Sequence, residues 1–397
     1  MRKFAATYLF TSEATLLRNA ILICYDDGTV QRVEQRGNGF REEAGVEFYS
    51  GILTPGFVNA HCHIEFSHLK GKISEKTGLA GFIGQINKLR NASDEERKKA
   101  MQVADRLMRA AGIAAVGDVS NSEISLQTKR KSEIQYHTFV EVFGFHPSRA
   151  DRAFNHAERV HLKFTERNLP ASIVPHSPYS VSDPLFQKIR KKAEDTIGIL
   201  SIHNQESKEE LQFFRDGSGP LADHLQHNLG LDISHWQPTG RSSLETILKY
   251  IPKSNPLLLV HNTFTGKGDV EILKSERSAE NTFLVLCPNA NLYIEGALPP
   301  VQLFQQNKLN ICLGTDSLAS NHQLSILAEM LTLQMHFPEI EIETLLEWVS
   351  INGARALGLE QKFGSFERDK NPGVNLITGL DLKNLKLTEK TRVKRLL

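Results

Sequence analysis

Histidines and acidic residues follow short apolar runs at several places along the chain. The residues concerned are His61, His63, His176, His203, His261 and Asp316. Residues two apart in an extended segment point to the same side, so His61 and His63 can approach one ion together. Neutral imidazole suits zinc or iron, and a carboxylate completes such a ligand set. The spacing therefore points to metal chemistry.

His203 and Asp316 are the residues that would complete the site begun by His61 and His63. One histidine after a strand is usually a satisfied loop residue, but a His-x-His pair, further histidines and an aspartate at successive strand ends are hard to explain in that way. A site with an open position can hold water and lower its pKa towards 7. We expect one divalent ion that activates water.

Three residues near these ligands are expected to be catalytic: Glu206, His261 and Asp316. Glu206 lies three residues after His203, where a carboxylate could take a proton from water and pass it to a leaving amine. Its alternative role is a glutamate that meets the dipole of a following helix. His261 could orient or polarise the water, or it could be a core histidine bonded to a backbone carbonyl. Asp316 could share the water's proton.

The elements that position these residues alternate between apolar runs and charged, helix-like segments, which favours βα units and a parallel sheet. The expected strands are Gly51–Ala60, Ile113–Val119, Tyr136–Val142, Ala171–Pro175, Ile197–Ile202, Pro256–Val260, Thr282–Leu286 and Leu309–Leu313. Eight units predict an α/β fold, a (β/α)₈ barrel of the TIM type with its active site at the carboxyl ends of the strands. An open doubly wound sheet would usually carry a Gly-rich loop after its first strand.

Both ends of the chain have short alternating strands instead. Ile21–Tyr25 runs into the turn Asp26-Asp27-Gly28, which predicts a β-hairpin. We expect a small β-sandwich-like domain composed of residues 1–52 and 363–397, with the barrel at 53–362. Ser207–Asn255 is long for one connection, and we expect a helix and a mobile loop near the active site there.

The overall composition excludes several classes of partner. Lys and Arg number 47 and Asp and Glu 46, so no net charge recruits nucleic acid or an anionic membrane. No stretch approaches the roughly 20 apolar residues of a membrane span, and no signal peptide is recognised. The four cysteines are scattered and are expected to be buried small hydrophobes. We expect a cytoplasmic enzyme with a small-molecule substrate.

The combined motifs resemble the amidohydrolase superfamily, in the branch of cytosine, guanine and aminofutalosine deaminases and chlorohydrolases. The matching pieces begin with Leu53–His63 and continue with Pro175–Ser182, His203–Glu206, Val260–Asn262, Cys287–Asn291 and Gly314–Ser317. The resemblance implies that His61, His63, His203 and Asp316 bind one metal, zinc or alternatively iron, and that Glu206 and His261 transfer protons. It also implies a possible homodimer.

The fourth apolar run ends in His176, where two-metal members of the superfamily place a lysine, so one metal is expected and His176 would face the substrate. Glu65 follows the His-x-His pair in a pattern similar to that of aminofutalosine deaminases, and it could accept hydrogen bonds from a purine-like base. Alternatively it is a structural carboxylate bonded to loop amides. Arg149 could bind a substrate carboxylate. His235 and Trp236 could contact a substrate ring, or they could be ordinary loop residues.

The function expected on this resemblance is hydrolytic deamination of an aminated heterocycle. A purine-type nucleoside such as 6-amino-6-deoxyfutalosine, of menaquinone biosynthesis, is the leading substrate. The alternatives are hydrolysis of a cyclic amide or a halogenated heterocycle, and a non-catalytic metal-binding barrel. The presence of both Glu206 and His261 beside the ligands argues against the last alternative.

Overall fold

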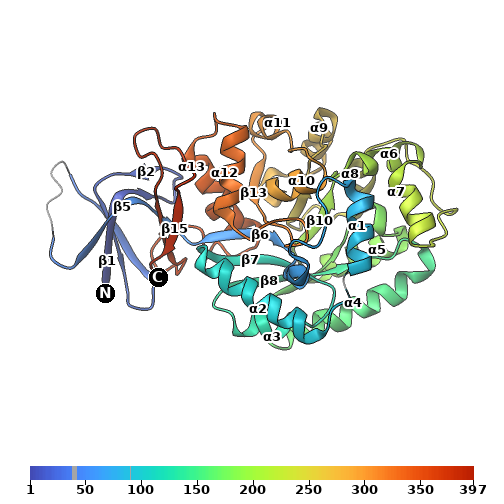
Figure 1. Ribbon diagram of the computed structural model, residues 1–397, viewed down its shortest axis with the longest axis horizontal. Coiled ribbons are helices and arrows are strands. Elements are labelled where there is room, and N and C mark those ends of the chain that lie inside the picture. Colours follow the sequence, from blue (N-terminus) through green and yellow to red (C-terminus); the bar gives the residue numbers. More distant parts are fainter. Residues whose placement is uncertain (38–42, 90) are drawn as a thin grey trace.

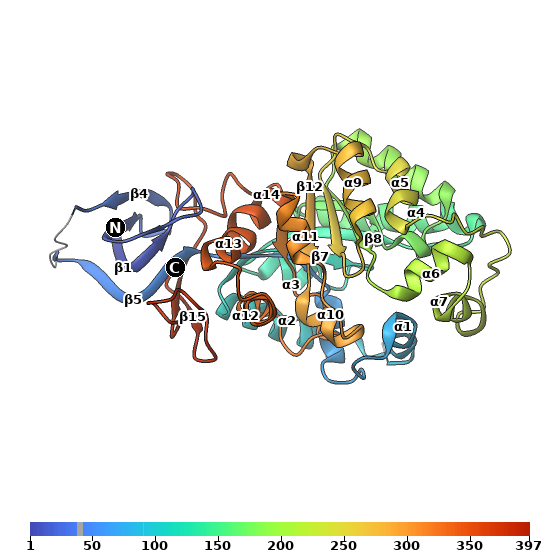
Figure 2. The ribbon, with the colours of Figure 1, turned by 90° about the horizontal axis from the view of Figure 1, so that it is seen from above.

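The structure is a computed structural model, and it describes residues 1–37, 43–89 and 91–397. A barrel of parallel strands and surrounding helices forms the larger part, and a separate sheet lies at one end of the molecule (Figure 1). Both chain termini lie at that sheet, as the view from above also shows (Figure 2). The chain therefore starts and finishes in the same small unit.

Eight parallel strands form the barrel, and each is buried along its length except for at most one half-buried residue. They are β6 (Phe57–Cys62), β7 (Ile113–Ser120), β8 (Gln135–Val142), β9 (Ala171–Pro175), β10 (Leu200–Asn204), β11 (Leu257–His261), β12 (Thr282–Leu286) and β13 (Asn310–Leu313). Near-continuous apolar runs are typical of parallel strands that are covered on both faces. Hence the carboxyl ends of all eight strands meet at one mouth.

The strands are hydrogen-bonded as two four-stranded sheets, β6 to β9 and β10 to β13. Two seams separate these sheets, one between β9 and β10 and the other between β13 and β6. Backbone hydrogen bonds close both seams at the mouth. The His203 N–H donates to the His176 carbonyl over 3.0 Å, and the Thr315 N–H donates to the His61 carbonyl over the same distance. The seams are therefore held beside the residues that the sequence marks as metal ligands.

Amphipathic helices cover the outside of the barrel. In α2 (Asp94–Ala110), the hydroxyl of Ser93 accepts from the Glu96 N–H, which caps the helix. Its buried residues include Met101, Ala104 and Met108, which recur at helical spacing and face the barrel. The following helices on this side are α3 (Leu126–Lys131), α4 (Ala150–Thr165) and α5 (Asp183–Thr196), and α9 (Lys267–Glu276), α11 (Val301–Gln306), α12 (Ile326–His336), α13 (Ile342–Glu347) and α14 (Gly353–Ala356) follow later.

Helices also gather above the mouth, from the connections after β6, β10 and β12. After β6 come a 3₁₀ turn at Ile64–Leu69 and α1 (Gly78–Leu89), and α10 (Pro288–Ile294) follows β12. The long segment after β10 contains α6 (Lys208–Asp216), α7 (Pro220–Asp223), a π-helical turn at His224–Asn228 and α8 (Ser243–Ile247). Leu79 of α1 shares one apolar cluster with residues of this segment. The segment is thus richer in helix than the sequence predicts.

The separate sheet at one end of the molecule joins the two ends of the chain. Its order is β15-β14-β5-β1-β3-β4, and β2 pairs with β1; the bounds are β1 (Arg2–Phe10), β2 (Leu16–Leu17), β3 (Ala20–Cys24), β4 (Val30–Gln35), β5 (Val46–Pro55), β14 (Val374–Thr378) and β15 (Arg392–Arg395). The predicted hairpin is present as β3 and β4, with Gly28 at a φ of 89° in its turn. The predicted domain boundary after residue 52 falls within β5.

The predicted strand Gly51–Ala60 is wrong in one respect, because it is two strands. Its first half ends β5 in the small sheet, and its second half is β6 of the barrel. The chain turns at Gly56, where a Cβ would lie 2.5 Å from the Ala114 Cβ and 2.5 Å from the Pro372 carbonyl oxygen. Glycine at this position lets the barrel pack against the small sheet.

Two other features bear on the sequence predictions. All four cysteines are buried and unpaired, as expected. In the described part of the chain, no helix combines the length and the apolar character that a membrane span needs.

Candidate metal centre and active site

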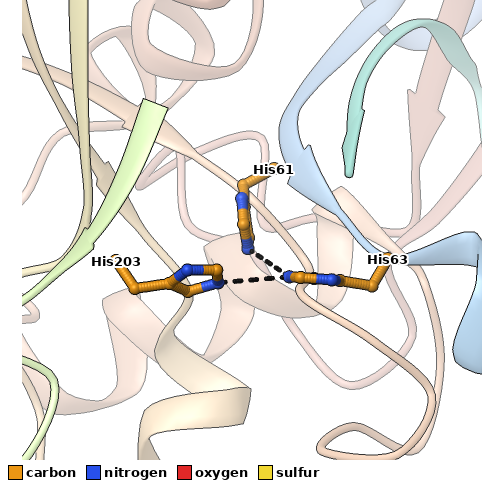
Figure 3. A group of neighbouring side chains, drawn as sticks. All are labelled: His61, His63 and His203. Atoms are coloured by element: carbon orange, nitrogen blue, oxygen red, sulfur yellow. Dashed lines mark hydrogen bonds between the residues drawn. The ribbon is translucent and has the colours of Figure 1, made fainter. Parts of the chain in front are cut away.

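Three buried histidines converge at the mouth of the barrel. His61 lies in β6, His63 follows that strand, and His203 lies in β10. The Nε2 atom of His63 is 3.1 Å from Nε2 of His61 and 3.2 Å from Nε2 of His203 (Figure 3). The sequence spacing thus brings together the three predicted histidine ligands.

Asp316 completes the group from the loop after β13. Its Oδ1 atom lies 3.6 Å from Nε2 of both His61 and His63, and its Oδ2 accepts a hydrogen bond from the Ser320 hydroxyl. Burial acts to raise the pKa of Asp316, but the hydrogen bond from His61 and the nearby histidines outweigh it and lower that pKa. The carboxylate is therefore ionised and available as a ligand.

The charge state of the histidines also suits a metal. Burial, together with the neighbouring histidines, lowers the pKa of His63 and that of His203. Both rings are therefore neutral near pH 7 and can offer a lone pair. Three convergent imidazole nitrogens and one carboxylate oxygen form a donor set that zinc and iron accept. The residues present fit one divalent ion.

Glu206 and His261 lie together beside this cluster. The Oε1 atom of Glu206 is 3.5 Å from Nε2 of His261. Burial, followed by the charge of Asp316, raises the pKa of Glu206 well above its usual value. Burial therefore favours the protonated form of Glu206, unlike a solvated glutamate at a helix start. The first turn of α6 fixes its backbone, because the Glu210 carboxylate accepts from the N–H groups of Gln205 and Glu206 over 3.1 and 3.2 Å.

His261 has a defined orientation. Its Nδ1 atom lies 2.8 Å from the Oδ1 atom of Asn291, and this side-chain oxygen accepts the Nδ1 proton. The second ring nitrogen, Nε2, therefore carries the lone pair and faces Glu206. Burial lowers the pKa of His261, so the ring is neutral before any reaction. This arrangement differs from that of a core histidine bonded to a backbone carbonyl.

Strained backbone is concentrated around these side chains. Gln205, His261, Asn262 and Asp316 have positive φ values of 46°, 75°, 57° and 54°. Such conformations are uncommon for residues other than glycine and are often found at active sites. All four follow or end strands β10, β11 and β13, where the chain must turn sharply to aim its side chains into the mouth.

His176 lies next to the metal cluster, after β9. Its ring centroid is 4.9 Å from that of His203, and its side chain is 26% exposed. Its Nδ1 atom lies 2.8 Å from the Ser180 hydroxyl and 3.0 Å from the Ser177 hydroxyl. Its Nε2 atom lies 4.0 Å from Oε1 of Glu141, and the substrate-facing role of His176 stays a prediction.

Glu65 is buried and bonded within the protein. Its carboxylate accepts from the Asn121 N–H at 3.4 Å and from the hydroxyls of Ser122 and Ser125 at 3.3 and 3.4 Å, and Arg97 lies 3.9 Å away. Burial raises the pKa of Glu65 to about 7. These contacts correspond to the structural alternative given above, and a role in reading a base stays a prediction.

Three further residues predicted to contact substrate, Arg149, His235 and Trp236, occupy different surroundings. Arg149 is exposed. His235 Nε2 lies 3.1 Å from the Phe145 carbonyl oxygen. Trp236 stacks on Phe213, with ring centroids 4.9 Å apart, within the apolar cluster above the mouth. None of the three contacts the histidine cluster, and their part in substrate binding stays a prediction.

The structure brings two further residues to the site, Glu141 and Asn291, which have no role in the sequence predictions. Glu141, in β8, lies 3.6 Å from Nδ1 of His203 and 4.0 Å from Nε2 of His176. Asn291 orients His261. A signal for Glu141 was present, because it is the one charged residue in the apolar run Tyr136–Val142 and stands near the carboxyl end of that strand.

Comparisons with known proteins agree with this architecture. An adenosine deaminase of Helicobacter pylori is 28% identical over 333 residues, which cover 83% of this chain and 79% of that protein. A crystal structure of Helicobacter pylori aminofutalosine deaminase in complex with methylthio-coformycin superposes with a TM-score of 0.83 at 22% identity, and all of both chains is covered. A zinc-bound adenosine deaminase of Xanthomonas campestris superposes with a TM-score of 0.73 at 20% identity, over 94% of this chain and 84% of that one.

A family model also matches most of the chain. The model described as the amidohydrolase family matches residues 52–392, which include the whole barrel and every predicted metal ligand. The chain therefore belongs to the amidohydrolase family.

Proposed function

We propose that this protein is a metal-dependent deaminase that hydrolyses the exocyclic C–N bond of a purine-type nucleoside. The observation that carries the proposal is the pairing of a protonated carboxyl, Glu206, with a neutral imidazole, His261, beside a divalent-ion site. Two groups of opposite protonation state can give and take protons in one hydrolysis. The names of several relatives, adenosine deaminase among them, support the choice of substrate.

The metal ligands, His261 and Glu206 have different roles in the proposed hydrolysis. A divalent ion, when bound by the three histidines and Asp316, lowers the pKa of a water molecule towards 7. His261 accepts the proton of the attacking water at Nε2 and orients the water towards the ring carbon that carries the amine. Glu206 donates its proton to the adjacent ring nitrogen and, as a carboxylate, then passes the proton of the added hydroxyl to the amine, which leaves as ammonia. The protonated His261 finally returns its proton to Glu206, which lies 3.5 Å away. Burial of both groups keeps competing bulk water away from the reacting atoms.

Zinc is the metal we propose, with iron as the alternative. The zinc in the Xanthomonas campestris structure and the donor set of this site both support zinc. 6-Amino-6-deoxyfutalosine is the substrate we propose first, because a structural neighbour over the full chain is an aminofutalosine deaminase. We also propose the homodimer expected from the resemblance, and light scattering of the purified chain measures it.

Ammonia release from the zinc-loaded protein tests the function. We expect turnover of 6-amino-6-deoxyfutalosine or of adenosine, with loss of the exocyclic amine seen by mass spectrometry. A panel of cyclic amides and chlorinated triazines serves as the comparison. Release of chloride, or ring opening, without ammonia from any aminopurine nucleoside would replace the deaminase proposal by one of the other hydrolytic reactions.

A further inference from the structure

Glu141 is a buried carboxylate that faces two histidines of the site. It is the penultimate residue of β8 and is 8% exposed. Its Oε2 atom accepts a hydrogen bond from the Asn121 side-chain amide over 2.9 Å. Its Oε1 atom lies 3.6 Å from Nδ1 of His203 and 4.0 Å from Nε2 of His176. A carboxylate in this position has no part in the chemistry described above.

The two histidines depend on Glu141 to different degrees. Nδ1 of His203 already donates to the His176 carbonyl over 2.7 Å, which fixes the proton on that nitrogen and leaves Nε2 for the metal. Nε2 of His176, by contrast, has no hydrogen-bond partner within the part of the chain that the structure describes. Removal of the carboxylate would therefore leave the ring of His203 fixed and affect His176.

The other side of the His176 ring indicates which nitrogen carries the proton. The hydroxyls of Ser177 and Ser180 lie 3.0 and 2.8 Å from Nδ1, and a hydroxyl can donate there. A negative charge near Nε2 favours a proton on Nε2 for the same neutral ring. Both surroundings favour the tautomer that has its N–H at Nε2, on a side chain that is 26% exposed.

We propose that Glu141 is a positioning residue that holds His176 as a hydrogen-bond donor to the substrate. The inference rests on the proposed function, in which His176 faces a nucleoside. The purine ring nitrogens N3 and N7 are acceptors, and so are the ribose oxygens. A fixed Nε2–H matches such an acceptor, whereas the other tautomer would present a lone pair and repel it.

The test compares E141Q, H176Q and the double variant with wild type, each loaded with zinc, on adenosine and 6-amino-6-deoxyfutalosine. We expect E141Q to raise KM about tenfold, as the loss of one oriented hydrogen bond would do, with kcat changed less than about threefold. The double variant should match H176Q, because Glu141 acts through His176. Zinc content of E141Q should equal that of wild type.

Two further measurements separate positioning from folding. Selective ¹⁵N-histidine labelling, with H176Q to assign the signal, should show a protonated Nε2 in wild type and a mixture of tautomers in E141Q. D105N removes another buried carboxylate, which accepts from Tyr136 near the opposite end of the same strand, and it should leave KM unchanged. N121A frees Glu141 without removing its charge and should raise KM less than E141Q does.

Several outcomes would overturn the inference. Loss of zinc from E141Q, or a fall in kcat at constant KM, would show that Glu141 acts through His203 and the metal and not through His176. Effects of E141Q and H176Q that multiply in the double variant would show that the two residues act independently. Absence of any nucleoside turnover by wild type would overturn the proposed function instead, and the tautomer measurement would still decide the role of Glu141.

Discussion

Glu206 and His261 are neighbours whose pKa values move in opposite directions. Burial raises the pKa of the carboxyl group and lowers that of the imidazole, because it disfavours the charged form of each. Burial thus favours the uncharged form of both, in which one has a proton to give and the other a lone pair. This pairing suits a hydrolysis that must protonate a ring nitrogen and deprotonate water.

Replacement of Glu206 by glutamine removes the donated proton and keeps the shape of the side chain. We expect kcat to fall by a factor of about 10² to 10⁴, the usual contribution of a positioned acid or base, with zinc content unchanged. Ammonia release under saturating substrate measures it. E209Q is the matched control, since Glu209 lies on the first turn of α6 and accepts instead from the Ala80 N–H. Similar losses in both variants would contradict the acid role.

Substitution of Asn291 tests whether catalysis depends on the orientation of His261. N291A removes the acceptor that holds the Nδ1 proton, so the imidazole can present either tautomer to Glu206. We expect kcat to fall by about one order of magnitude or more while KM changes little, since the interaction matters in the transition state. Steady-state kinetics with the Asn291→Asp variant provides the comparison, because aspartate keeps the acceptor. Equal losses in the two variants would argue against this role.

Between elements, Glu329 connects α12 to α10. Its buried carboxylate accepts from the backbone N–H and side-chain amide of Asn289 and from the side-chain amide of Asn321. Burial raises its pKa from 4.5 to about 8. The folded chain therefore binds this proton more tightly than the unfolded chain does, and Glu329 makes the free energy of unfolding fall as pH rises from about 4.5 to about 8.

The variant E329Q should weaken this pH dependence. Each unit of pKa shift corresponds to about 1.4 kcal/mol of unfolding free energy. As pH rises from 5 to 8, wild type should therefore lose more unfolding free energy than E329Q. Urea unfolding at both pH values measures it. E341Q, at an exposed residue just before α13, is the control and should follow wild type. An unfolding free energy that changes with pH equally in E329Q and in wild type would contradict the prediction.

Local patterns were enough to place most barrel strands. The bounds of β9 and β12 agree with the prediction, because each is a short apolar run between polar segments. Ile197 was predicted to begin the fifth barrel strand. It instead ends α5 with a φ of 50° and is 74% exposed, and β10 starts at Leu200. Hydrophobicity alone cannot distinguish an apolar helix cap from the first residue of a strand.

The site was predictable where its residues recur at strand ends. The convergence of His61, His63 and His203 follows from strand periodicity and barrel topology. The environments of Glu65 and Trp236 did not follow in this way, because their partners come from distant loops and helices whose packing no local pattern encodes. The role of Glu141 likewise depends on which strand lies next to it.

At the scale of the molecule, metal removal should lower stability. Ligand binding to the folded state alone stabilises it by about 4 kcal/mol at a thousand times the dissociation constant. We expect chelation to lower Tm and zinc to restore it. D316N, which weakens one ligand, should show a smaller response to zinc than wild type, measured by thermal unfolding at fixed zinc concentrations. If chelation left the Tm of the metal-loaded protein unchanged, the prediction of a stabilising metal at this site would be wrong.

The two seams of the barrel have a consequence for how the chain unfolds. His61 and His63 belong to the first four-stranded sheet, whereas His203 and Asp316 belong to the second. An ion held by all four would cross-link two halves that few backbone bonds join at the mouth, much as a disulfide joins distant segments. The metal-loaded chain should then unfold in one step. Without metal, amide hydrogens of the two halves should exchange at separate rates. The ion that serves catalysis would then also join two half-barrels into one cooperative unfolding unit.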